Sequence, residues 1–391
     1  PGRGNRCGGS ATRPTSLPRR MEVKEHEMAF RRVRWSRVVF EEIPIYVQPD
    51  HPHWFVPNAA GDRLLERLRV DPSTRVNTSE ARFLARLPKV TEPARPYPGR
   101  EAFLSTDRLD ELWFHVTDRC DLACRHCLFS CGPKAAPEMP AEQILELAGQ
   151  AHRLGARVFA LTGGEPLVHR ECRRVLGGLL ELAASNLVIL TNGMSIRSHA
   201  EFLTQLPRER LHLQVSVDGP ERCHDHLRGK GAFSRLRGQL DWLRREDWPF
   251  TMSTCVDRSN MHEMVHLVET AAEIGASALH LIWYFVRGRG RKAEAPDTDL
   301  LVGALIKAAL RAEELGVHID NFDAVRSRIF APAGTKHDGS SSGWYSLAVA
   351  PDGKLYPSPA LIGIEELSTG INGDLATSWR SSEVLSRLRS T

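Results

Sequence analysis

The stretch HVTDRCDLACRHCLFSC, residues 115–131, decides the fold prediction. It continues the apolar run ELWFHVT and places Cys120, Cys124 and Cys127 in CxxxCxxC spacing. Thiolates are the usual ligands of iron–sulfur clusters, and a [4Fe–4S] cluster has four irons to coordinate. Three ligands in one short loop therefore leave one iron available for a group that is not cysteine.

The same spacing has other interpretations. It also fits a zinc knuckle, with His126 or Cys131 as the fourth ligand, or a disulfide pair. Three further cysteines are either packed thiols or functional ones, and the sequence leaves that choice open. They are Cys131, Cys223 and Cys255.

Strand-like runs alternate with helical stretches around and beyond this loop. The apolar runs are ELWFHVT, ARVFALTGG, LVILTNG, LHLQVSVDG, PFTMSTCVD and ALHLIWYFV. The helical stretches between them end near glycines such as Gly155 and Gly275. Such alternation predicts parallel β/α units. Six strands are fewer than the eight of a closed barrel, so we expect an α/β fold with a partial (β/α)6 TIM barrel over residues 111–329.

Short polar motifs follow the second, third and fourth strand-like runs. Active sites of β/α barrels are built at the carboxyl ends of the strands, where these motifs would meet the cysteine loop. The candidate residues are Gly163, Gly164, Glu165 and Pro166, then Thr191 and Asn192, then Ser216 and Asp218, and finally Arg228.

In this order the motifs resemble the radical S-adenosylmethionine (radical SAM) superfamily. The resemblance implies one [4Fe–4S] cluster on the three cysteines, with S-adenosylmethionine chelating the fourth iron. It further implies that the GGEP stretch with Glu165 binds the methionine amino group. Ser216 and Asp218 would then lie around the ribose and the carboxylate, which Arg228 also reaches. The implied enzymatic reaction is reductive cleavage to a 5′-deoxyadenosyl radical, which abstracts hydrogen from a substrate.

Residues 330–391 resemble the C-terminal SPASM or twitch extension of that superfamily. YSLAVAPDGKLYPS predicts a hairpin with an Asp-Gly turn. Serines stand where the family's auxiliary-cluster cysteines are expected, at 340–342 and at Ser358, and no cysteine follows Cys255. Serine is a poor ligand for iron–sulfur sites. We therefore expect the extension without an auxiliary cluster.

The N-terminal part predicts a separate module. Residues 1–37 are expected to be a disordered, basic segment, and residues 88–110 a linker rich in proline near its start. Between them, residues 38–87 predict a small α+β module in which EEIPIYV is an exposed edge strand, WFVPN a turn, and two helices follow. It loosely resembles the leader-peptide-binding winged-helix domain of ribosomal peptide maturases. The alternative is a structural cap on the barrel.

Composition limits the function classes. The net charge of +4 is too small to argue for nucleic acid, and no apolar run approaches the roughly 20 residues of a membrane span. Eight cysteines in a chain without a secretory signal indicate metal or redox chemistry in the cytoplasm.

Three functions remain open from the sequence. The first is a radical SAM peptide maturase that acts on a peptide or protein and takes electrons from an external flavodoxin or ferredoxin. The second is a small-molecule radical SAM enzyme of tetrapyrrole or cofactor biosynthesis. The third is a non-catalytic iron–sulfur protein that binds peptide.

Overall fold

The computed structural model describes residues 35–40, 42–47, 54–87, 99–102, 104–134, 136–330, 340–370 and 374–390. The chain divides into two compact units, Pro1–Tyr97 and Pro98–Thr391, and each is described by itself. Most of the predicted disordered N-terminus (1–34) and the first part of the predicted linker (88–98) lie outside the described residues.

The N-terminal unit is a three-stranded antiparallel sheet followed by two helices. Its elements are β1 (Ser36–Phe40), β2 (Ile43–Val47), β3 (Trp54–Phe55), α2 (Ala59–Val70) and α3 (Thr78–Leu84). Both helices begin at asparagine caps, and Asn77 forms a complete capping box with Glu80. A separate small core, which contains Tyr46, Leu64, Leu65, Leu68 and Leu84, holds the helices to the sheet.

Two expectations for this unit are wrong. The strand within EEIPIYV is β2, and it lies in the centre of the sheet, paired with β1 on one side and β3 on the other. The WFVPN stretch, predicted as a turn, supplies the two residues of β3. In addition, β1 begins at Ser36, two residues before the predicted module boundary. Within the described residues, β1 and β3 are therefore the outer strands of this sheet.

Six parallel strands form the predicted barrel sheet. They are β4 (Glu111–His115), β5 (Val158–Thr162), β6 (Asn186–Thr191), β7 (Leu211–Ser216), β8 (Phe250–Val256) and β9 (Ala278–Trp283). Their order in the sheet is their order in the chain, which confirms the partial barrel. Because neighbouring strands are parallel, all six carboxyl ends lie at one rim of the sheet.

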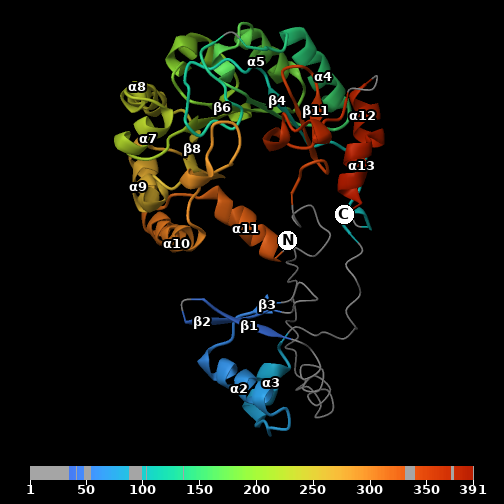
Figure 1. Cartoon of the computed structure of the whole chain (residues 1–391), viewed down its shortest axis with the longest axis vertical. Coiled ribbons are helices and arrows are strands. Elements are labelled where there is room, and N and C mark those ends of the chain that lie inside the picture. The colour runs from blue at the N-terminus through green and yellow to red at the C-terminus, as the bar shows by residue number, and fades with distance from the viewer. Residues whose placement is uncertain are drawn as a thin grey trace, which may run out of the picture. The chain divides into compact units, whose positions relative to one another are not determined.

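Helices connect the strands along the outside of the curved sheet or follow its last strand (Figure 1). They are α4 (Ala141–Arg153), α5 (Cys172–Glu181), α6 (Ala200–Leu203), α7 (Glu221–Arg228), α8 (Ala232–Arg245), α9 (Met264–Ile274), α10 (Thr298–Leu315) and α11 (Asp320–Phe330). The apolar face of α4, with Ile144, Leu147 and Ala151, is buried against the sheet. As predicted, Gly275 ends α9 in the left-handed conformation, with φ of 71°.

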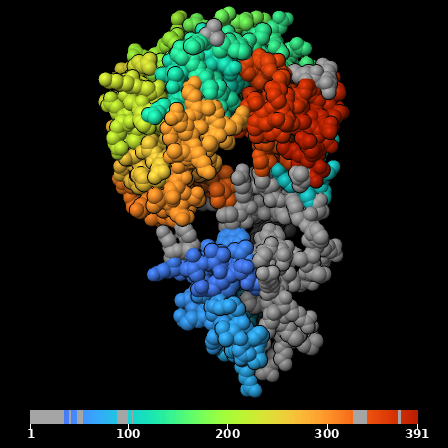
Figure 2. All heavy atoms as spheres, in the orientation of Figure 1, coloured from blue at the N-terminus to red at the C-terminus, as the bar shows by residue number. Residues whose placement is uncertain are grey.

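The C-terminal region extends the same sheet. The hairpin predicted around Asp352 is confirmed as β10 (Ser346–Val349) and β11 (Leu355–Tyr356). Strand β10 pairs in parallel with β4, so the sheet has eight strands in the order β11-β10-β4-β5-β6-β7-β8-β9. In Figure 2 the C-terminal residues, in red, lie directly against the residues that begin the barrel.

Two short helices, α12 (Leu375–Ser381) and α13 (Glu383–Arg389), complete the C-terminal region. Trp379 is fully buried, and its indole Nε1 donates a hydrogen bond of 2.6 Å to the carbonyl of Thr106. The chain end therefore packs against the segment that leads into β4. Within the described residues, every helix is too short or too polar to cross a bilayer.

Candidate active site

A cavity of about 220 Å³ opens at the rim where the carboxyl ends of the strands meet. Nine of the twelve residues predicted for the site line it: Cys120, Cys124, Cys127, Gly163, Gly164, Thr191, Asn192, Ser216 and Arg228. The other three, Glu165, Pro166 and Asp218, lie behind its wall. The structure thus brings together residues that follow the ends of four strands, β4 to β7. The first and last of these strands end more than 100 positions apart in the chain.

The three cysteines lie on the loop that follows β4. Cys120 and Cys124 are buried, Cys127 is partly exposed, and all three thiols are free. Burial raises the pKa of Cys120 to about 12 and raises that of Cys124 as well. Hydrogen bonding from Cys131 instead lowers the pKa of Cys127 to about 5. A metal centre bound here must displace protons from the two buried thiols, because metal ligands are thiolates.

The two glycines of the GGEP stretch pack against the backbone of the cysteine loop. The N–H of Gly164 donates a hydrogen bond of 2.7 Å to the carbonyl of Thr117, and the N–H of Glu165 donates one of 3.0 Å to the carbonyl of Arg119. A Cβ on Gly164 would lie 2.2 Å from the Arg119 carbonyl oxygen. Glycine is therefore required here for the approach of one strand end to the cysteine loop.

Glu165 braces two strand ends from behind the cavity. Its carboxylate accepts hydrogen bonds from the hydroxyl of Thr191 at 2.8 Å and from the N–H of Asn192 at 2.7 Å. It also accepts the N–H of Leu167, and so caps the short turn that begins at Pro166. Burial raises the pKa of Glu165 to about 7, against the effect of these donors. The predicted contact of Glu165 with a methionine amino group stays a prediction.

Asn192 extends this hydrogen-bond network to the cavity. Its side-chain amide donates to the carboxylate of Asp121 at 2.7 Å and lies 3.6 Å from the sulfur of Cys120. The end of β6 is thereby hydrogen-bonded to the cysteine loop as well as to Glu165.

Asp218 and Arg228 form a buried ion pair. Arg228 Nε donates to Asp218 Oδ2 at 2.6 Å, and the two side chains are 9% and 0% exposed. Burial acts to raise the pKa of Asp218, but Arg228 outweighs it and holds that pKa at about 2. Asp218 also accepts the N–H of Cys255 at 2.9 Å. Asp218 thus fixes the guanidinium of Arg228, and Arg228 alone of the pair reaches the cavity.

The sequence that forms this arrangement matches the model of a known protein family. The model of the radical SAM superfamily matches residues 114–271, which hold the cysteine loop and the GGEP stretch. The chain contains a radical SAM domain. The superfamily implies one [4Fe–4S] cluster and S-adenosylmethionine as its cofactors.

Curated relatives of this domain differ in what they make. An AdoMet-dependent heme synthase of Methanosarcina barkeri is 29% identical over 46% of this chain and 52% of its own length. The subtilosin biosynthesis protein AlbA of Bacillus subtilis is 26% identical over 62% of this chain and 53% of its own length. The chain thus spans about half the length of these relatives.

Solved structures show the same fold at low identity. The crystal structure of Streptococcus suis SuiB bound to S-adenosylmethionine has a TM-score of 0.63 and 14% identity, and the match covers 90% of each chain. SuiB bound to its precursor peptide SuiA gives a TM-score of 0.61 at 13% identity, and that match covers 91% of each chain. At this identity the likeness establishes the fold.

The residues of the cavity fit the cofactors of a radical SAM domain. Five cysteines line the cavity, among them the three of the CxxxCxxC spacing, and thiolates are the ligands an iron–sulfur cluster needs. Two cations, Arg228 and Arg289, line the same cavity and offset the negative charge of a cluster with three thiolates. Polar groups of Asn192 and Ser216 remain on the wall for a polar cofactor.

Sequence reasoning missed Arg289, which holds the cysteine loop from the far side. Its guanidinium donates to the carbonyls of Cys124 at 2.6 Å and Cys131 at 2.8 Å, and its N–H donates to the carbonyl of Cys127 at 3.0 Å. The neighbouring Gly288 packs against the same loop, where a Cβ would lie 2.4 Å from the Cys127 carbonyl oxygen. The RGRG sequence at 287–290 was the available signal, since alternating glycines permit close backbone approach.

We expect Gly164→Ala to lose most of the bound iron. The added methyl group meets backbone atoms of Arg119, so the cysteine loop must move away from the strand end. Gly177→Ala is the matched control, because its Cβ meets nothing within 4 Å and it lies inside α5. That control should keep its iron and gain about 0.5–1 kcal/mol of stability. Iron content of the two reconstituted variants measures the difference, and equal iron in both would contradict the packing role of Gly164.

Proposed function

We propose that the chain is a peptide-modifying radical SAM enzyme. It cleaves S-adenosylmethionine reductively at one [4Fe–4S] cluster and abstracts hydrogen from a peptide or protein. The observation that supports the chemistry is the convergence of three cysteines, the GGEP glycines, Asn192 and Arg228 on one cavity. An external low-potential protein of the flavodoxin or ferredoxin type supplies the electron.

Each side chain has a defined task in this proposal. Cys120, Cys124 and Cys127 hold the cluster, which supplies the electron that breaks a carbon–sulfur bond of S-adenosylmethionine. Arg228, fixed by Asp218, binds the carboxylate of the methionine portion. The main chain at Gly163 and Gly164 and the amide of Asn192 orient the rest of that portion.

Apolar side chains make the other wall of the cavity and exclude water from the reacting carbon. Ile282, Trp283 and Phe285 come from the end of β9 and the segment after it. Trp283 and Phe285 are also 49% and 41% exposed, so this wall extends from the cavity to the surface. Such a wall suits a substrate larger than the cavity itself, as a peptide would be.

The peptide substrate is supported by the N-terminal unit. Among the described residues, β1 pairs only with β2, so it leaves one edge of backbone N–H and C=O groups open. An extended peptide can add to such an edge as one more strand. Val38 and Val39 of β1 are 52% and 51% exposed and offer apolar contacts to its side chains. The SuiB structure with its precursor peptide favours the same substrate class.

A small-molecule substrate is the second candidate. The relative named as an AdoMet-dependent heme synthase favours it, because that relative is 29% identical over its matched residues and its name gives heme as the product. In that case the N-terminal unit serves as a structural cap.

A turnover experiment distinguishes these candidates. Cluster-loaded protein is incubated anaerobically with reductant, S-adenosylmethionine and synthetic short peptides encoded beside its gene. We expect a mass change in one peptide, located by fragmentation to a residue within its C-terminal part. If 5′-deoxyadenosine forms but every such peptide keeps its mass, the small-molecule hypothesis replaces the peptide proposal.

A further inference from the structure

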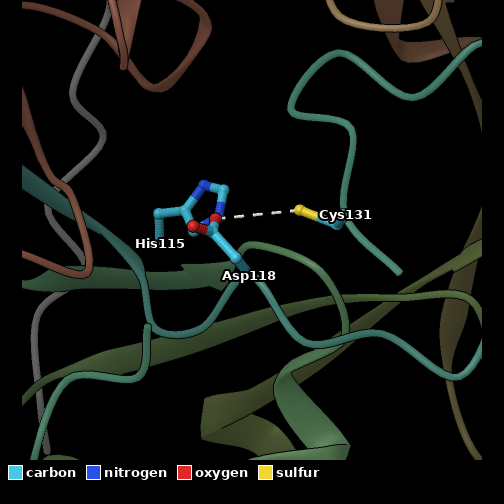
Figure 3. A group of neighbouring side chains, drawn as sticks. All are labelled: His115, Asp118 and Cys131. Carbon is cyan, nitrogen blue, oxygen red and sulfur yellow. Dashed lines mark hydrogen bonds and ion pairs between the residues drawn. The ribbon is translucent and has the colours of Figure 1, made fainter. Parts of the chain in front are cut away.

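Three potential metal ligands meet at the base of the cysteine loop, outside the set that the radical SAM domain uses. His115 is the last residue of β4, Asp118 lies three residues later, and Cys131 lies beyond Cys127 (Figure 3). Their ligand atoms all lie within 4.8 Å of one another. His115 Nε2 is 2.7 Å and Cys131 Sγ is 3.8 Å from Asp118 Oδ1.

His115 is buried without a hydrogen bond of normal geometry. Its side chain is 1% exposed, and neither ring nitrogen has a hydrogen-bond partner among the described residues. Although Nε2 lies next to the carboxylate of Asp118, the two are not aligned as donor and acceptor. Phe129 packs edge-on against the ring, with 4.5 Å between centroids, and offers it no polar atom. The buried ring therefore has the Asp118 carboxylate beside Nε2 and, among the described residues, no polar partner for Nδ1, an arrangement that disfavours burial.

A simple ion pair between His115 and Asp118 does not resolve this arrangement. It leaves the thiol of Cys131 at a long contact of 3.8 Å from the carboxylate of Asp118, beside the hydrogen bond that the thiol makes with Cys127. A cation between the three groups would satisfy the carboxylate, the thiolate and one ring nitrogen together.

The three donor atoms indicate which cation would bind between them. Imidazole nitrogen, carboxylate oxygen and thiolate sulfur are the ligands of zinc, at about 2.0–2.3 Å from the metal. A tetrahedron with bonds of that length has edges of about 3.3–3.8 Å. The separation of Asp118 and Cys131, 3.8 Å, lies at the end of this range, the His115–Asp118 pair must widen from 2.7 Å, and the His115–Cys131 separation is at most 4.8 Å.

We propose that His115, Asp118 and Cys131 bind one zinc ion. Water completes the coordination from a second cavity of about 350 Å³, which Asp118 lines together with Phe129 and Tyr356. Asp118 precedes Cys120 and Cys131 follows Cys127, so the zinc joins the two ends of the cysteine loop. Its role is structural, in parallel with the hydrogen bond of 2.9 Å from the N–H of Cys120 to the carbonyl of Gly132.

Metal analysis of the cluster-loaded protein tests this proposal. The full chain is reconstituted anaerobically, equilibrated with zinc chloride and desalted, and iron and zinc are measured in the same sample. We expect one zinc per chain beside about four irons. Cys131→Ser and Asp118→Asn each remove one ligand atom at nearly constant volume. Both should weaken zinc binding by more than the about 10–100-fold typical of losing an outer partner, with iron unchanged.

Cys223→Ser is the matched control, because Cys223 is also buried but lies in α7 and contacts the carbonyl of Ser259. It should keep both metals. Replacement of zinc by cobalt(II) gives a second readout, a thiolate-to-cobalt absorption band that Cys131→Ser should abolish and Cys223→Ser should keep. Absence of zinc from the wild-type protein, or unchanged zinc affinity in Cys131→Ser, would overturn the proposal. Loss of iron from Cys131→Ser would do so as well, since Cys131 would then serve the cluster.

Discussion

Replacing Cys124 by alanine should remove the iron–sulfur cluster. Two cysteines cannot replace the three ligands of the loop, and the other two cysteines that line the cavity, Cys131 and Cys255, lie outside the CxxxCxxC spacing. Iron should fall from about four per chain to near zero after anaerobic reconstitution, with loss of the brown cluster absorption.

The control for this variant is Cys172→Ala. Cys172 is buried like Cys124, but it lies at the start of α5 and does not line the cavity. It should keep its iron even if the helix is somewhat destabilised. A Cys124→Ala protein with a full complement of iron would show that the ligands are not those of the CxxxCxxC loop.

Deleting the N-terminal unit should abolish peptide modification. A chain that begins at Pro98 keeps the whole second unit, including the barrel core and the cavity. It loses the edge of β1, on which the substrate proposal rests. A peptide held there is tethered to the chain that carries the cavity, which raises its effective concentration, and the truncated chain lacks this advantage. Peptide mass should stay unchanged while 5′-deoxyadenosine still forms without coupling to substrate.

Two readouts keep this experiment interpretable. Iron content and 5′-deoxyadenosine formation report whether the truncated chain is intact, and peptide mass reports the role of the deleted unit. Modification at an unchanged apparent KM would mean that the unit is only a cap. The small-molecule candidate would then become the stronger one.

The barrel and most of its site could be predicted because they depend on local sequence. CxxxCxxC spacing brings three thiols into one loop. The length of each apolar run and the period of its apolar residues indicate each buried strand. Parallel strands then bring their carboxyl ends together without further information, which is why nine of the twelve predicted residues line one cavity.

The remaining features depend on contacts that spacing does not encode. The carboxylate of Glu165 meets the end of β6 from behind, a contact across 27 positions, so it braces the site and does not line it. Arg289 reaches the carbonyl of Cys124 across 165 positions. In the N-terminal unit, β2 became the central strand only because the two residues of β3, too few for a periodic signal, pair with it.

The formation of 5′-deoxyadenosine by the wild-type protein tests the central claim most directly. The full chain, loaded with its cluster and reduced by dithionite, is incubated with S-adenosylmethionine, and the products are separated by chromatography. The account predicts 5′-deoxyadenosine and methionine in equal amounts, both dependent on the reductant. A reduced protein with a full complement of iron that leaves S-adenosylmethionine intact, with and without peptide, would contradict it.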